Sequence, residues 1–92
     1  MKIESILNIS NVKILLYLYN SNREARYSEL LREIAMARST LAYVLSELEE
    51  EKLIKRKVIS TKPIQVLYSL TKKGEEIARH FLQILDILRK DP

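Results

Sequence analysis

The chain has 92 residues, of which 47% are hydrophobic and 30% are charged, and its formal net charge is +4. This is the length of one small domain, and the balance of apolar and charged residues excludes a disordered chain. A domain of this size buries only about two thirds of its chain surface, so dimerisation would stabilise it.

The residue types that are missing exclude several classes of function. Without cysteine, the chain has no disulfide framework, thiolate metal site, cysteine nucleophile or thiol redox sensor. The single histidine, His80, excludes a multi-histidine metal cluster, and the single glycine, Gly74, excludes a glycine-rich phosphate loop. We therefore expect no enzyme, no metal and no cofactor. No apolar run is long enough to span a membrane and no signal peptide is recognisable, so we expect a cytoplasmic protein without a membrane partner.

The positive charge is concentrated in one segment. Residues 52–74 contain seven basic residues and no acidic one, whereas the rest of the chain holds nine basic and twelve acidic residues. A local basic field suits a polyanion as partner, although a basic run by itself is more often a solvated surface.

The first half of the chain is predicted to be helical. Residues 1–9 form a short helical arm, and a helix over residues 11–19, capped by Ser10, is apolar on nearly all sides and therefore buried. After a turn, a short helix over residues 29–35, capped by Ser28, leads through a tight connection into a third helix over residues 38–51. Two short helices joined in this way form a helix-turn-helix. The third helix has an inward stripe of Leu41, Val44, Leu45 and Leu48, and an opposite side with Ser39, Ala42, Tyr43 and Ser46.

In the second half of the chain, the hydrophobic residues no longer recur with the period of a helix. A strand over residues 53–59, a turn at residues 60–63 and a second strand over residues 65–70 predict a β-hairpin. Thr71 then caps one long helix over residues 72–90. The predicted fold class is mainly α with a small β-hairpin, in a single domain over residues 1–92.

Four runs carry a resemblance to a known family. They are residues 28–35, 38–41, 48–56 and 67–74. In this order and spacing they resemble the winged helix-turn-helix DNA-binding domain of MarR-, PadR- and HxlR-like transcriptional regulators, over about residues 10 to 90. The resemblance implies that residues 10–71 form the helix-turn-helix and its wing, which is the hairpin, and that residues 72–90 form a C-terminal dimerisation helix.

The sequence departs from the family pattern at two places. Lys52 stands where the family usually has glycine after the recognition helix, which predicts either a modestly strained lysine or a different helix exit. The wing tip, Ser60 to Ile64, is short and lacks glycine and arginine, which weakens the case for a contact with the minor groove.

DNA binding requires cations for phosphates and polar side chains for base edges. If the recognition helix enters the major groove by its N-terminal half, the side chains nearest the bases are those of Arg38, Ser39, Thr40 and Tyr43. Among side chains, arginine makes the commonest specific contact with guanine. Ser46, one helical turn beyond Tyr43, is expected to reach a phosphate. The alternative for Arg38, Ser39 and Thr40 is that they are simply residues that favour the start of a helix. The alternative for Tyr43 is a surface tyrosine that covers a neighbouring helix.

The basic residues of the wing divide between its two faces. Alternation places Lys55 and Lys57 on one face and Arg56 on the other. We expect Lys55, Lys57 and Lys62 to contact phosphates, and we expect Arg56 to bridge to an acidic residue. The glutamates at 47 and 49–51 lie in the other half of the recognition helix, as a solvated end that pairs with Lys52 or Lys55.

The last helix has an apolar stripe wider than the roughly 100° that one surface helix needs for its own core. The surplus predicts a symmetric dimer, since two-fold pairing is the commonest oligomer, and the alternative is a helix folded back on its own domain. His80 lies beside the stripe and is assigned no role. The residues predicted to form the dimer contact are Ile77, Phe81, Ile84, Leu85 and Leu88.

The leading interpretation is a homodimeric regulator that binds specific sequences of double-stranded DNA, as a repressor. A second interpretation is a winged-helix module that binds protein, which would more often carry apolar residues at positions such as Ser39 and Ser46. A third is RNA binding or nonspecific architectural binding. The ratio of the affinities for a specific site and for random DNA, at one salt concentration, would distinguish it from sequence-specific binding. A dimer cleft has room for a small-molecule effector, but no residue marks one.

Overall fold

The computed structural model describes residues 1–91, which form five helices and three strands. Their order is α1 (Ile3–Ile6), α2 (Ile9–Asn20), β1 (Glu24–Arg26), α3 (Tyr27–Glu33), α4 (Arg38–Glu50), β2 (Ile54–Ile59), β3 (Gln65–Leu70) and α5 (Lys72–Arg89). Across residues 1–91, no helix combines the length and the apolar character that a membrane crossing requires.

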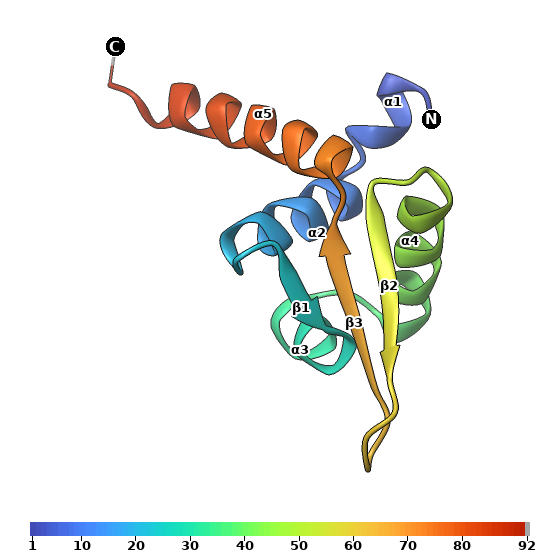
Figure 1. Ribbon diagram of the computed structural model, residues 1–92. Coiled ribbons are helices and arrows are strands. Elements are labelled where there is room, and N and C mark those ends of the chain that lie inside the picture. The colour runs from blue at the N-terminus through green and yellow to red at the C-terminus, as the bar shows by residue number, and fades with distance from the viewer. Residues whose placement is uncertain (92) are drawn as a thin grey trace.

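The three strands form an antiparallel sheet in the order β1–β3–β2. In the view of Figure 1, α3 and α4 lie behind the sheet, and the β2–β3 hairpin projects beyond them as the wing. Helix α5 crosses the opposite end, with α1 beside its first turns, and then extends away from the domain. The molecule is elongated as a result, with extents of 52 × 26 × 26 Å.

The core lies between the helices and the inner face of the sheet. The predicted stripe of α4 is buried in full, and α2 contributes Ile14, Leu15 and Leu18, each with no exposed surface. The sheet adds Ala25, Ile54 and Tyr68. Because Tyr68 stands opposite both Ala25 and Arg56 in the ladder, these residues share one sheet face. The mainly α fold with a small β-hairpin that the sequence predicts is therefore confirmed, and strand β1 extends the hairpin to a three-stranded sheet.

Two predicted helix caps are wrong. Helix α2 begins at Ile9, because the side-chain oxygen of Asn8 accepts a hydrogen bond from the Ser10 amide at 2.9 Å. Helix α3 begins at Tyr27, so Ser28 lies inside its first turn. The cause is the unpredicted strand β1, whose pairing with β3 holds Arg26 extended and leaves no loop residue before the helix. A three-residue strand with one buried side chain, Ala25, is too short to show an alternating pattern.

Lys52 adopts the conformation that usually requires glycine. Its φ is 62°, in the left-handed region. Its amide donates to the Glu49 carbonyl at 2.9 Å, and the Leu53 amide donates to the Leu48 carbonyl at 3.0 Å. These two hydrogen bonds form a Schellman motif at the end of α4. Of the two possibilities that the sequence left open, the strained lysine is the one present.

The start of α5 is fixed to the turn between α4 and β2. The Thr71 amide donates to the Leu53 carbonyl at 3.1 Å, and its hydroxyl lies 2.7 Å from the Lys52 carbonyl oxygen. The same hydroxyl accepts the Gly74 amide at 3.0 Å, which confirms Thr71 as the cap of α5. Gly74 is itself buried against this turn. A Cβ atom there would lie 1.9 Å from the Leu53 carbonyl oxygen, so only glycine fits.

Arg23 ties the end of α2 to α5. Its guanidinium stacks 3.8 Å from the centre of the Tyr19 ring and donates to the Tyr19 carbonyl at 2.8 Å. Its Nε also pairs with a Glu75 carboxylate oxygen at 3.1 Å. These contacts and the Gly74 junction together hold α5 at one angle to the domain.

We predict that Gly74→Ala destabilises the domain by about 3 kcal/mol. The methyl group of the alanine would overlap the Leu53 backbone and force α5 away from the turn between α4 and β2. Urea unfolding followed by circular dichroism measures the change. The control is Glu76→Ala, an exposed position two residues further along α5, which should change the free energy of unfolding by less than about 0.5 kcal/mol. Equal stability of the two variants would contradict the proposed close contact.

Candidate nucleic-acid interface

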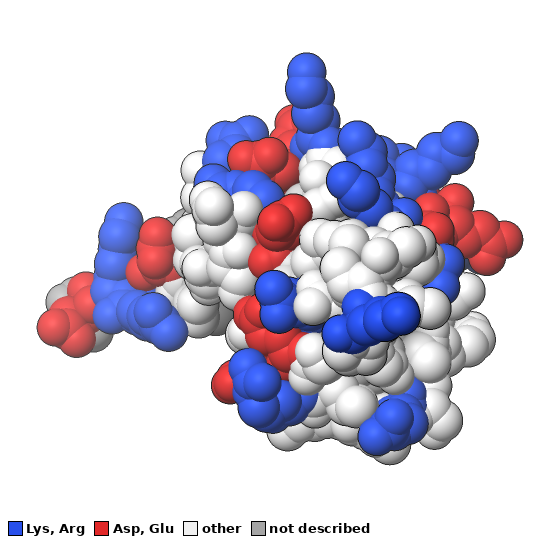
Figure 2. All heavy atoms as spheres, turned by 60° about the horizontal axis from the view of Figure 1, so that its bottom comes forward, with Lys and Arg blue, Asp and Glu red and all other residues white. Residues whose placement is uncertain are grey.

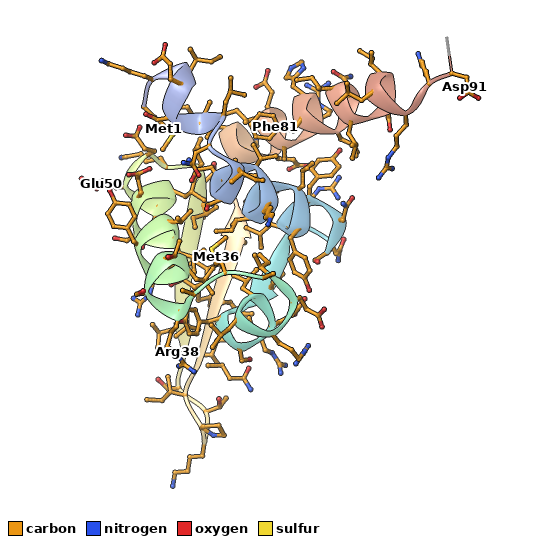
Figure 3. All side chains as sticks on the ribbon, turned by 180° about the vertical axis from the view of Figure 1, so that it is seen from behind. Met1, Met36, Arg38, Glu50, Phe81 and Asp91 are labelled. Carbon is orange, nitrogen blue, oxygen red and sulfur yellow. The ribbon has the colours of Figure 1, made fainter. Side chains whose placement is uncertain are left out.

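The N-terminal end of α4 and the tip of the wing lie at the same end of the molecule. Figure 3 places Arg38 at the end of α4 nearest the hairpin tip and Glu50 at the other end. The connection from α3 is short, since Ile34 ends α3 and Ala37 is the N-cap of α4. This places α3 and α4 as the helix-turn-helix that the sequence predicts.

All eight side chains that the sequence assigned to DNA are exposed. On α4 the buried stripe faces the core and the polar side faces away from it. Five of the eight lie on α4 outside its buried stripe, and three lie on the wing. In chain order they are Arg38, Ser39, Thr40, Tyr43, Ser46, Lys55, Lys57 and Lys62.

Tyr43 is the one large apolar ring on this side of α4, and 67% of its surface is exposed. The hydrogen bond of its hydroxyl with the Glu47 carboxylate raises the pKa of Tyr43, and the charge of Glu47 adds to the effect. Tyr43 lines a shallow hollow together with Ser5 and Asn8, and most of its ring stays exposed. It therefore remains available to a partner.

The wing residues divide between two faces, as alternation predicts. Lys55 stands opposite Ser69, and Lys57 stands opposite Leu67, on the outer face of the sheet. Arg56 stands opposite Tyr68 on the core side. The predicted bridge from Arg56 to an acidic residue is wrong, because no carboxylate pairs with it within residues 1–91. Its neighbour is the Tyr68 hydroxyl. Burial raises the pKa of Tyr68, and Arg56 acts in the opposite direction.

The glutamates of α4 lie toward the end remote from Arg38 (Figure 3). Their predicted pairing with Lys52 or Lys55 is also wrong, since neither lysine forms an ion pair within residues 1–91. Instead, a Glu51 oxygen accepts a hydrogen bond from the amino group of Met1 at 2.8 Å. This contact holds α1 against the end of α4.

The structure adds candidate residues that the sequence did not indicate. A hollow of about 360 Å³ separates the stem of the wing from the start of α3, and Arg26, Ser28 and Gln65 line it. Arg26 is exposed and lies in the same ladder row as Lys57, with Leu67 between them. Only the pairing of β1 with β3 brings Arg26 beside the wing, so the missing strand explains why the sequence did not reveal it. Figure 2 views the molecule with this end turned forward and shows lysine and arginine groups at several places on the surface, with carboxylates between some of them.

The five residues predicted for the dimer contact differ in burial along α5. Ile77 and Phe81 are half-buried against the domain core, and Leu85 is also half-buried. Ile84 and Leu88 are 52% and 76% exposed, where α5 extends beyond the domain. Residues of α1 and α5 together line an apolar cleft of about 410 Å³. The apolar stripe of α5 thus packs on the domain core over its first half and is exposed over its second half.

We predict that Glu47→Gln lowers the pKa of Tyr43 toward the usual value for tyrosine of about 10, since it removes the charged acceptor of the hydroxyl. An NMR titration of the labelled tyrosine ring measures it. In the control, Glu50→Gln, the pKa should move less, because the charge of Glu50 is the smallest of the four causes. A larger shift in the control would show that the hydroxyl does not face Glu47.

Comparisons with known proteins give the family. A family model for the HxlR-like helix-turn-helix matches residues 10–90. The transcriptional regulator YodB of Bacillus subtilis is 33% identical over 60 residues, which cover 64% of this chain and 54% of YodB. This chain therefore matches only about half the length of that relative.

Solved structures share the fold. A transcriptional regulator, ytfH from Salmonella typhimurium, has a TM-score of 0.79 at 27% identity, over 92% of this chain and 75% of its own. A regulator homologue from Pyrococcus horikoshii has a TM-score of 0.80 at 22% identity, over 98% and 93% of the two chains. YodB and ytfH are both named as transcriptional regulators. With the winged fold in place and the family model matching nearly its whole length, the chain belongs to the HxlR-like helix-turn-helix family.

Proposed function

We propose that this chain is a homodimeric transcriptional regulator that binds specific sequences of double-stranded DNA and acts as a repressor in the cytoplasm. The observation that carries the proposal is the exposure of Arg38, Ser39 and Thr40 at the end of the molecule that also carries the wing tip. Repression requires only that the bound protein occupies its site on the DNA.

The proposed docking inserts α4 into the major groove by its N-terminal end. Arg38 then reads a base edge, with guanine O6 and N7 as its best partners, and Ser39 and Thr40 contact base edges or phosphates beside it. Tyr43 lies one turn further along the outer side of α4 and packs on the groove wall. Glu50 stays outside the groove, because it lies at the opposite end of the helix, whereas Glu47 lies beside Tyr43 and forms a hydrogen bond with its hydroxyl.

The proposed role of the wing is contact with phosphates. Lys57 and Lys62 are exposed and close to the tip, and Lys55 precedes them on the same face as Lys57. Arg26 and Ser28 are added to the interface, since the hollow that they line opens between the wing and α3. Phosphate contacts fix the protein on the duplex and make its affinity depend on salt.

The polar outer side of α4 supports DNA over protein as the partner. A helix that docks on a protein groove presents apolar anchors at successive turns. Ser39, Ala42 and Ser46 occupy those positions on α4 and are all exposed. Tyr43 is the one large side chain among them.

The proposed dimer contact is the outer half of α5, together with α1. Three apolar side chains at this end are more than half exposed, Ile84, Ile87 and Leu88, and α1 and its C-cap add Ile3 and Leu7. Burying such side chains between two copies removes apolar surface from water, at roughly 25 cal/mol for each Å². An exposed apolar patch of this kind marks an interaction surface.

We predict that Arg38→Ala weakens binding to the preferred DNA site by about 1–3 kcal/mol and weakens binding to random DNA less. Fluorescence anisotropy at one salt concentration measures both affinities. Arg79→Ala is the control, since it removes the same charge from an exposed position on α5. An equal loss on both DNAs would assign Arg38 to a phosphate, as we propose for Lys57 and Lys62. No loss on either would favour the protein-binding module.

We predict that Ile84→Glu combined with Leu88→Glu converts the dimer into a folded monomer, because a dimer would have to bury unpaired charges. Both side chains are exposed in a single copy, so the domain itself should keep its stability. Sedimentation equilibrium at micromolar concentration measures the mass, and circular dichroism checks the fold. A matched variant, Arg79→Gln combined with Gln83→Glu, makes the same change in net charge at exposed positions outside the α1–α5 cleft and should stay dimeric. A wild-type protein that sediments as a monomer would contradict the proposed assembly.

A further inference from the structure

The basic residues of the acid-free segment 52–74 do not gather at the wing tip. Five of the seven line a single hollow of about 720 Å³ at the root of the wing, where the end of α4, the start of β2 and the first turn of α5 meet. They are Lys52, Lys55, Arg56, Lys72 and Lys73. Glu49 is the one acidic side chain that lines the same hollow.

None of these five cations forms an ion pair within residues 1–91. The ion pairs formed among residues 1–91 involve Met1, Arg23 and Arg32 as their positive groups. Five positive charges around one hollow repel one another, and an anion that enters it removes this repulsion. The N-terminal end of α5 opens on the same hollow and adds the positive end of its helix dipole.

The hollow lies away from the proposed DNA-reading end, and Lys55 is the one proposed DNA contact that also lines it. Glu49 and Lys52 lie at the end of α4 opposite Arg38, and thirteen helical residues span about 20 Å. The same separation follows from β2, whose six residues lead from the hollow toward the wing tip over about 20 Å. A duplex that contacts Arg38 and the tip therefore lies away from Lys52, Lys72 and Lys73.

We infer that this hollow is a binding site for a small anion that bears two or more phosphate groups. A single phosphate matches too few of the five cations, whereas a chain of phosphates offers an oxygen to each. Lysine ammonium groups bind phosphate as point charges, and Arg56 adds a planar donor for two oxygens. The site joins the turn after the reading helix, the wing and the proposed dimer helix, so an occupant contacts all three.

The test uses inorganic triphosphate as the probe and isothermal titration calorimetry at fixed ionic strength on the full chain. One saturable site per chain is expected. The triple variant Lys52→Gly, Lys72→Gln, Lys73→Gln should lower the affinity by about tenfold or more, since it removes three charged donors. Glycine at position 52 suits the left-handed backbone there, so this variant should stay folded. Glu49→Gln should tighten binding, because it removes the one carboxylate at the site.

The matched control removes the same charge elsewhere, by Lys13→Gln, Arg79→Gln and Lys90→Gln at exposed positions outside the hollow. It should bind triphosphate nearly as well as the wild type. Absence of a saturable site, or equal losses in the two triple variants, would overturn the inference. A loss of DNA affinity in the hollow variant beyond that of the control would also overturn it, by assigning the hollow to the DNA backbone. A nucleoside triphosphate that binds more tightly than inorganic triphosphate would support a nucleotide as the source, and equal binding would support the phosphate chain alone.

Discussion

The close approach of Gly74 to the Leu53 carbonyl is the constraint on which the arrangement of this molecule depends. With no side chain at position 74, the backbone of α5 lies directly on the turn between α4 and β2. The Thr71 hydroxyl then contacts the Lys52 and Leu53 carbonyls and the Gly74 amide at once, so α4, the wing and α5 meet at one junction. On the other side of α5, Arg23 forms an ion pair with Glu75.

A fixed junction gives the proposed function its geometry. If two copies pair through α5, the distance between their reading helices depends on the angle at which α5 leaves each domain. A symmetric dimer with a stiff junction presents two copies of Arg38 at one spacing, and a DNA site with two half-sites about 34 Å apart matches such a spacing. A loose junction would let the two domains move independently, and the dimer would then no longer favour DNA sites with one half-site spacing. In the proposed dimer, the Gly74 contact would therefore link the packing of one domain to the specificity of DNA binding.

The sequence predicts most of the fold because its helices have strong periodic patterns. The stripe of α4 and the Thr71 cap of α5 were both found from spacing and residue type alone, and the structure confirms them. Features that depend on pairing distant segments could not be read in this way. Strand β1 exists through its pairing with β3, and that pairing shifts the start of α3 and brings Arg26 to the wing. The convergence of the wing-root cations likewise depends on the meeting of α4, β2 and α5, which the run of charges does not encode.

Selection of bound sequences from a random pool of double-stranded DNA tests the central claim most directly. The account predicts a two-fold symmetric consensus, with half-sites centred about 10 base pairs apart, because two reading helices related by symmetry contact successive turns of the major groove. Enrichment of a consensus without symmetry would contradict the dimer that α5 is proposed to form. The absence of any enriched sequence, at a salt concentration where the protein still binds DNA, would contradict specific reading by Arg38 and the N-terminal end of α4.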